Sequence, residues 1–289
     1  MAEKDITEKT LESFNDVFAD IINGLLFNGE QILRQESLID AQTFSMYKND
    51  GKLHHQDRDV AKYWIDQQGE RITVRLAFLG IENQSNYDPD MPLRVIGYDG
   101  AVYRAELSQK DRYPVVTLVL YFGERPWGKN RTIYDAVHIP EKIRPYVNDY
   151  KINLFEIANL PEEAVNHFHS DFRAVIDFFI SVKKDQVYKP KNTVILKHVN
   201  ELLELMSVLT HDNRFVELRD EKGVKPENMR EIWDRIEERG RQEGFREGAD
   251  QNRLENIRSL MESMKLTAKQ AMEALKIPES EQSKYIARL

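Results

Sequence analysis

The chain has 289 residues, 41% of them hydrophobic and none of them cysteine, so it can bury a core but can form neither disulfides nor thiolate sites. Its net charge is −8, and residues 221–289 carry 14 basic and 14 acidic side chains, so the whole excess lies in residues 1–220 and argues against tight non-specific binding to nucleic acid. The sequence has no apolar leader and no run of about 20 apolar residues, which predicts a cytoplasmic protein that does not enter a membrane.

The first predicted element is a helix over residues 10–27, because its apolar residues recur at helical spacing. Asp16, Asp20 and Asn23 are four and three residues apart, so they form a separate polar stripe on that helix. The stripe indicates either a solvated face or a set of polar groups aimed at a site.

Strands are predicted next. Residues 38–47 favour an irregular strand, and a hairpin is predicted after it from strands over Asp57–Ile65 and Arg71–Glu82. Asp57 and Asp59 are two residues apart, so they share one face of the first hairpin strand. Either aspartate can therefore lie beside the second strand of the hairpin.

The end of that second strand carries the most informative polar residues. The apolar run 76–81 leads into Glu82-Asn83-Gln84, and alternation along a strand points Glu82 and Gln84 to the same face. A carboxylate is costly at such a position unless a cation pairs with it. If the hairpin brings Asp57 or Asp59 beside Glu82, the converging oxygens suit a hard divalent cation. Alternatively, Glu82 and Gln84 lie just beyond the sheet and are solvated.

A further helix is predicted to begin after Asp90, which is a plausible N-cap. Arg94 and Tyr98 are four residues apart and share one face of that helix. They either contact a phosphate or pack against nearby carboxylates. A buried strand is predicted over residues 114–123, and Trp127 after it is interpreted as a packing residue.

The C-terminal part is predicted to be helical. Its last residues contain a capping box of Thr267 and Gln270 and an apolar stripe between Leu254 and Met264. A stripe of this kind must be buried against something, which suggests partner binding or self-association into a homo-oligomer. Four parts are predicted: a core over residues 1–140, a helical extension over 141–220, a charged linker or exposed helix over 221–252, and a small helical tail over 253–289.

An aspartate, a hairpin and then Glu-x-Gln resembles the PD-(D/E)XK nuclease pattern, with Gln84 where many members carry lysine. The longer strings at residues 80–85 and 90–99 are similar to the bacterial recombination-promoting nucleases, also described as PD-(D/E)XK family transposases. Residues 15–23 and 271–278 also resemble that family, so the likeness covers most of the chain. The resemblance implies an α/β fold with an αβββαβ core on a mixed sheet, and an endonuclease linked to recombination or mobile elements.

The same resemblance implies roles for individual residues. Asp59 and Glu82 would bind Mg²⁺, for which Mn²⁺ can substitute, and Gln84 would orient the attacking water. Asp20, Arg94 and Tyr98 would support that site, and the partner would be DNA. The alternative is a non-catalytic interaction or assembly protein on the same fold. An ion pair from Glu82 to an arginine, with no room for a metal, would favour that alternative.

Overall fold

The computed structural model describes residues 11–49, 52–67, 73–107, 112–185, 188, 190, 194–221 and 226–289. The chain divides into two compact units, Met1–Ile232 and Trp233–Leu289. Within the described part of the chain, no helix has both the length and the apolar character needed to cross a bilayer.

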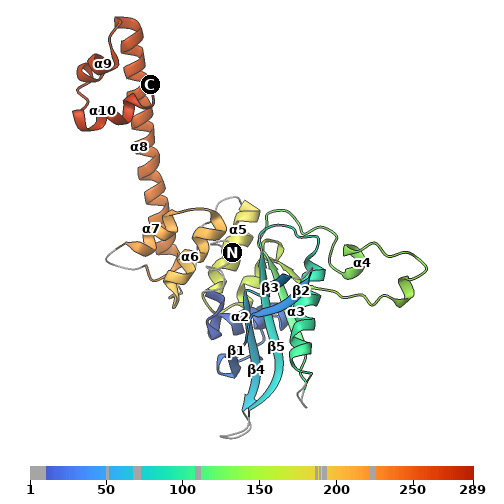
Figure 1. The fold of residues 1–289 in the computed structure, drawn as a ribbon. Helices are drawn as coiled ribbons and strands as arrows, with labels where there is room; N and C mark the ends of the chain where they lie inside the picture. The colour runs from blue at the N-terminus through green and yellow to red at the C-terminus, as the bar shows by residue number, and fades with distance from the viewer. Residues whose placement is uncertain are drawn as a thin grey trace. The chain divides into compact units, whose positions relative to one another are not determined.

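The first unit is a mixed α/β structure built on a five-stranded sheet with strand order β1-β4-β5-β6-β7 (Figure 1). β1, β4 and β5 pair in antiparallel fashion, whereas β6 and β7 run parallel to β5. The five strands are β1 (Leu38–Asp40), β4 (Val60–Gln67), β5 (Thr73–Gln84), β6 (Val115–Tyr121) and β7 (Asn153–Glu156).

The single irregular strand predicted at residues 38–47 is wrong, because two strands share this segment. β1 ends at Asp40, and β2 (Phe44–Asn49) pairs with β3 (Lys52–Asp57) in a separate two-stranded sheet. The predicted hairpin is confirmed as β4 and β5, but its first strand begins at Val60. Asp57 instead ends β3 opposite Phe44, and its side chain lies outside the described residues, as do residues 71–72.

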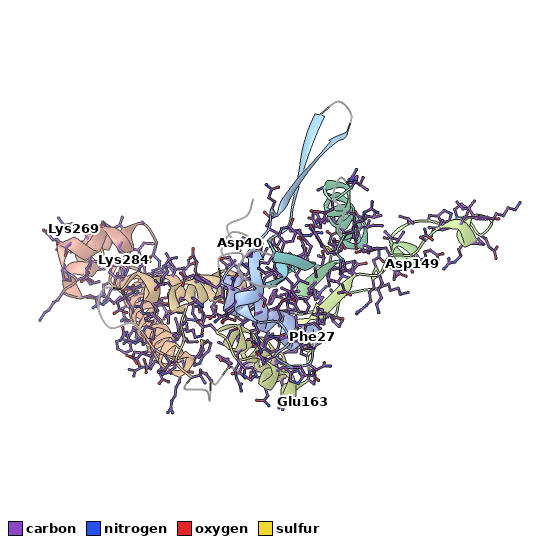
Figure 2. The ribbon with its side chains drawn as sticks, turned by 90° about the horizontal axis from the view of Figure 1, so that it is seen from below. Phe27, Asp40, Asp149, Glu163, Lys269 and Lys284 are labelled. Carbon is purple, nitrogen blue, oxygen red and sulfur yellow. The ribbon has the colours of Figure 1, made fainter. Side chains whose placement is uncertain are left out.

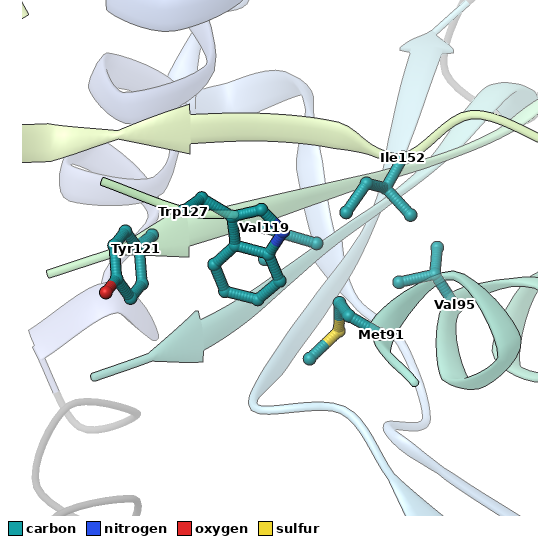
Figure 3. Close-up of a cluster of buried hydrophobic side chains, with 6 residues drawn as sticks. All are labelled: Met91, Val95, Val119, Tyr121, Trp127 and Ile152. Carbon is teal, nitrogen blue, oxygen red and sulfur yellow. The ribbon is translucent and has the colours of Figure 1, made fainter. Parts of the chain in front are cut away.

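β5 is buried on both faces from Ala77 to Asn83, which explains why its sequence is a nearly continuous apolar run. The helix predicted after Asp90 is α3 (Met91–Ala105), and its Arg94 and Tyr98 contact Glu82 on one face of β5. A cluster there joins α3 to β6 and to the loop beyond it (Figure 3), and its buried members are Met91, Val95, Val119, Tyr121, Trp127 and Ile152. Trp127 has no exposed surface, so the prediction of a packing residue is confirmed.

Helix α2 (Asn15–Leu26) lies on the opposite face of the sheet from α3. On that face the Nζ atom of Lys62 on β4 lies 5.7 Å from the ring centroid of Phe18 on α2. Every residue from Val17 to Leu25 is buried. A solvated polar stripe is therefore wrong for this helix, because neighbouring segments cover all of its faces.

The remaining helices of this unit are short, apart from α5 and α6. A long segment between β6 and β7, which carries α4, extends away from the sheet (Figures 1 and 2), and Asp149 lies on it. Apart from α2 and α3, the described helices that lie wholly in this unit are η1 (Gln35–Ser37), α4 (Ile133–Ala136), η2 (Arg144–Tyr146), η3 (Ile157–Asn159), η4 (Glu162–His167), α5 (Phe172–Asp185), α6 (Val199–Thr210) and α7 (Arg214–Asp220).

The second unit contains most of α8 (Met229–Met264), followed by α9 (Ala268–Ala274) and α10 (Glu279–Ile286). The predicted capping box is present at the start of α9. Leu254 and Ile257 of the predicted apolar stripe are buried against side chains of this same unit, among them Met272 and Tyr285. The beginning of the stripe therefore needs no partner, whereas Met264 at its end is exposed, and self-association stays a prediction.

Candidate active site

The β4–β5 register brings two acidic residues to one end of the sheet. Val60 pairs with Ile81, so the preceding residue, Asp59, faces Glu82 across the hairpin. Directly opposite residues share a face, which here is the α3 side. The backbone N–H of Asn83 donates a hydrogen bond of 2.6 Å to Oδ2 of Asp59. The structure thus brings Asp59 and Glu82 together and fixes the orientation of Asp59.

Glu82 is 2% exposed, and three donors converge on one of its carboxylate oxygens. Oε1 accepts hydrogen bonds from Nη2 of Arg94, from the hydroxyl of Tyr98 at 3.4 Å and from Nε2 of Gln84 at 3.4 Å. Nη1 of Arg94 also donates to Asp88, at 2.9 Å. Gln84, Arg94 and Tyr98 therefore all lie at the end of β5 with Glu82.

The second oxygen of Glu82 has different surroundings. Oε2 is buried and has no hydrogen-bond partner among the residues that the structure describes. Leaving a buried carboxylate oxygen without a partner is costly, so such an atom calls for an explanation. A cation or a water molecule outside the polypeptide would provide one.

The electrostatics of the site disfavour the charged form of Glu82. Burial, and then the neighbouring Asp59, raise the pKa of Glu82 to about 8, although Arg94 and Arg58 act in the opposite direction. Burial and the charge of Glu82 raise the pKa of Tyr98 to about 12. A cation bound beside Glu82 would favour the charged carboxylate.

The donor set fits a hard divalent cation of the magnesium type. Mg²⁺ commonly binds proteins through one or two carboxylates and keeps several waters. Asp59 and Glu82 supply two carboxylates, and Oε2 of Glu82 is the oxygen that remains available. No group of three or more His, Cys, Asp or Glu side chains suited to a metal occurs in the described ranges. A site closed entirely by protein ligands, as for structural zinc, does not fit this arrangement.

A buried ion pair lies under the site, and the sequence interpretation missed it. Arg58 and Asp99 form a salt bridge in which both side chains are less than 5% exposed. Thr117 donates to the same oxygen of Asp99 at 2.6 Å, and Tyr150 donates to the other oxygen. Gly80 makes room for the arginine, because a Cβ atom at this glycine would lie 2.9 Å from Cδ of Arg58. A glycine inside an apolar strand was the available signal.

The structure does not bring Asp20 to this site. Asp20 is 5% exposed, and its carboxylate accepts hydrogen bonds from the backbone N–H groups of His169, at 2.9 Å, and Ser170, at 2.7 Å. Glu12, which precedes α2, accepts a 2.7 Å hydrogen bond from Nδ2 of Asn83, whose side chain alternates to the sheet face opposite Glu82. The prediction for Asp20 was wrong because helical spacing alone does not reveal which neighbouring segment a polar stripe meets.

Asp20→Ala should therefore destabilise the fold by about 2 kcal/mol, because it removes the charged acceptor of two backbone hydrogen bonds. Urea denaturation measures this loss. Glu163→Ala, at an exposed position, is the control and should change the free energy of unfolding by less than about 0.5 kcal/mol. Equal stability of the two variants would show that the Asp20 contacts contribute nothing.

Comparison with known proteins adds one match. A family described as "Putative transposase, YhgA-like" matches residues 66–216, which is just over half of the chain. No curated protein and no solved structure matches the chain significantly. The matched range includes Glu82, Gln84, Arg94 and Tyr98 and begins downstream of Asp59.

Proposed function

The chain belongs to the YhgA-like transposase family, and from this premise we propose that it is a DNA endonuclease that requires a divalent cation. Family membership links the protein to mobile-element processes and to interaction with DNA. The observation that carries the nuclease proposal is that the buried Oε2 of Glu82, beside Asp59, has no hydrogen-bond partner among the described residues. Two carboxylates with one available oxygen are suited to holding Mg²⁺ or Mn²⁺ against a phosphodiester.

The topology supports a PD-(D/E)XK core as the framework for this activity. If the inserted β2–β3 hairpin is set aside, the order α2, β1, β4, β5, α3, β6 follows the αβββαβ pattern. Its strands form one mixed sheet, with the acidic residues at the end of the β4–β5 hairpin. This arrangement supports Asp59 and Glu82 as the proposed ligands.

Each residue of the site has a separate proposed role. Asp59 and Glu82 would hold the cation, which supplies Lewis-acid stabilisation of the charge that develops on the phosphate. Gln84 would orient the attacking water by hydrogen bonding, since an amide neither takes up nor releases a proton at neutral pH. Arg94, whose side chain is 37% exposed, would contribute its positive charge to binding the phosphate.

The ion pair between Arg94 and Glu82 favours a second function, a non-catalytic interaction protein. In that case Arg94 is the permanent counterion of Glu82, and no metal is needed. The two functions differ in what occupies Oε2, because Arg94 contacts only Oε1. Calorimetric titration with Mg²⁺ separates them: the nuclease binds the ion in the absence of DNA, whereas the interaction protein does not.

Nicking of supercoiled plasmid DNA tests the proposed activity directly. The full-length protein should relax the plasmid with Mg²⁺ or Mn²⁺ and should leave it intact in EDTA. Cleavage in excess EDTA would eliminate the cation-dependent mechanism. No cleavage, together with no calorimetric Mg²⁺ binding, would leave the interaction protein as the better description.

Gln84→Lys should retain nicking but need more Mg²⁺ than the wild type. Lysine places a cation near the charge that develops on the phosphate, yet it also repels the metal from Glu82, 3.4 Å away in the native contact. Rates measured across a Mg²⁺ titration reveal the shift. Gln84→Met, which removes the amide without adding charge, is the matched control. An inactive Gln84→Lys protein that still binds Mg²⁺ and DNA would show that the amide has a specific role.

A further inference from the structure

The long segment between β6 and β7, residues 123–152, forms an arm that extends away from the sheet (Figures 1 and 2). It begins at the end of the sheet where the candidate site lies, because the last residue of β6, Tyr121, pairs with Gln84 of β5. Nδ2 of Asn130 donates a 3.0 Å hydrogen bond to the carbonyl of Pro89, in the connection that leads from β5 to α3. The base of the arm is therefore fixed next to the candidate site.

The arm is basic, although the chain as a whole is acidic. Residues 125–151 contain six lysine or arginine residues and three aspartate or glutamate residues, in a chain of net charge −8. Two of the three acids, Asp135 and Asp149, each accept hydrogen bonds from two backbone N–H groups of the arm itself. Five of the six basic residues are exposed, namely Arg125, Lys129, Lys142, Arg144 and Lys151. This distribution of charge complements the phosphates of a nucleic acid.

The tip of the arm, residues 140–149, is fixed by contacts within the arm. The hydroxyl of Tyr134 lies within hydrogen-bond distance of the carbonyls of Arg144 and Val147, at 3.1 and 2.7 Å. The central carbon of the Arg144 guanidinium lies 4.5 Å from the Tyr134 ring centroid. Backbone hydrogen bonds of η2 add to these contacts. Because the tip is already ordered, it can present side chains to a partner at a low entropic cost.

Two large hydrophobic residues are exposed at this tip. Ile143 is 51% exposed and Tyr146 is 86% exposed. Lys142 and Arg144 flank Ile143 in the sequence, so apolar and basic groups alternate along the tip. Large apolar groups exposed together on an ordered segment indicate a contact surface. Apolar side chains next to lysine and arginine are typical of proteins that enter a DNA groove and partly unstack a base step.

We propose that the arm binds duplex DNA next to the scissile phosphate, with its basic side chains on the backbone phosphates and with Ile143 and Tyr146 inserted into a groove as a wedge. The proposal rests on the proposed function and adds to it the surface that holds the substrate at Asp59 and Glu82. A second copy of the chain fits this surface less well, because two tips in contact would bring like positive charges together.

Salt-dependent DNA binding tests the proposal. The probe is a short, fluorescently labelled DNA duplex, titrated with full-length protein in EDTA so that cleavage does not interfere, and its anisotropy is measured over a range of salt concentrations. Tyr146→Ala removes the wedge ring, and Lys129→Ala with Lys142→Ala removes two exposed charges. The matched controls lie outside the arm: Phe245→Ala removes a ring that is 82% exposed, and Arg34→Ala removes an exposed charge.

Tyr146→Ala should bind about 5- to 100-fold more weakly with an unchanged salt dependence, because a ring contact releases no counterions. The double lysine variant should bind more weakly and should lower the slope of log affinity against log salt by about two. Both controls should bind as the wild type does.

Equal affinity and slope for all five proteins would overturn the proposal. A lower mass of Tyr146→Ala in light scattering, with unchanged DNA affinity, would also overturn it and would identify the tip as a contact between copies of the chain. Plasmid nicking is scored separately. Binding that depends on the arm without any nicking would refute the endonuclease and leave the DNA-binding arm, whereas nicking with binding that does not depend on the arm would refute the arm alone.

Discussion

Glu82→Gln should reduce Mg²⁺-dependent nicking by at least about 10²-fold, because even residues that only orient metal ligands contribute 10- to 100-fold and Glu82 is proposed as a ligand itself. Glutamine keeps the volume of the side chain and an oxygen for Arg94 and Tyr98, so the protein should stay folded. The calorimetric Mg²⁺ signal should disappear together with the activity.

Glu156→Gln is the matched control for this experiment. Glu156 is also an acid at the end of a strand of the same sheet, and it is paired with Arg131. This variant should retain both Mg²⁺ binding and nicking. An active Glu82→Gln protein would contradict the proposed site, and an equal loss in both variants would indicate a general effect on the sheet rather than removal of a ligand.

Glu82→Gln should also change how the stability of the protein depends on pH, measured in EDTA. Burial and Asp59 raise the pKa of Glu82 from 4.5 to about 8 in the folded protein. The native state therefore keeps a proton that the unfolded chain releases, and the resulting stabilisation is complete below pH 4.5 and lost as the pH rises towards 8. Glu82→Gln lacks this loss, so its melting temperature relative to the wild type should rise between about pH 5 and about pH 9. A constant difference would contradict the raised pKa.

Strand periodicity was sufficient to place part of this site. The two-residue spacing of Glu82 and Gln84 put both on one face, and their contact at 3.4 Å agrees with that prediction. The four-residue spacing of Arg94 and Tyr98 likewise put both on the face of α3 that meets Glu82. These relations are local, because one strand or one helix fixes them without reference to the rest of the fold.

Other parts of the site depend on how separate elements meet. The choice between Asp57 and Asp59 depended on where the chain leaves β3 and enters β4, since the inserted hairpin ends at Asp57. Asp20 is directed to the backbone of His169 and Ser170, and not to the end of β5, because of the way α2 is set on the sheet. Periodicity within a helix contains no information about that placement.

Asp99→Ala should lower the free energy of unfolding by about 3–5 kcal/mol, because it leaves Arg58 as a charge buried in the core without its counterion. The loss is large because both side chains are less than 5% exposed, and Thr117 and Tyr150 lose an acceptor as well. Urea denaturation gives the value. Asp88→Ala removes a more exposed carboxylate from Arg94 and should cost less than about 1 kcal/mol.

A double substitution tests whether the Arg58–Asp99 ion pair serves only the stability of the fold or also the activity. Arg58→Met with Asp99→Leu replaces the ion pair by apolar side chains and should recover much of the stability that Asp99→Ala loses. Nicking should not recover with it, because Arg58 directly precedes Asp59 in the chain. A double variant that is stable and fully active would show that the pair serves only the fold. A stable, inactive one would show that the buried charge under the sheet positions Asp59 for its partner across the hairpin.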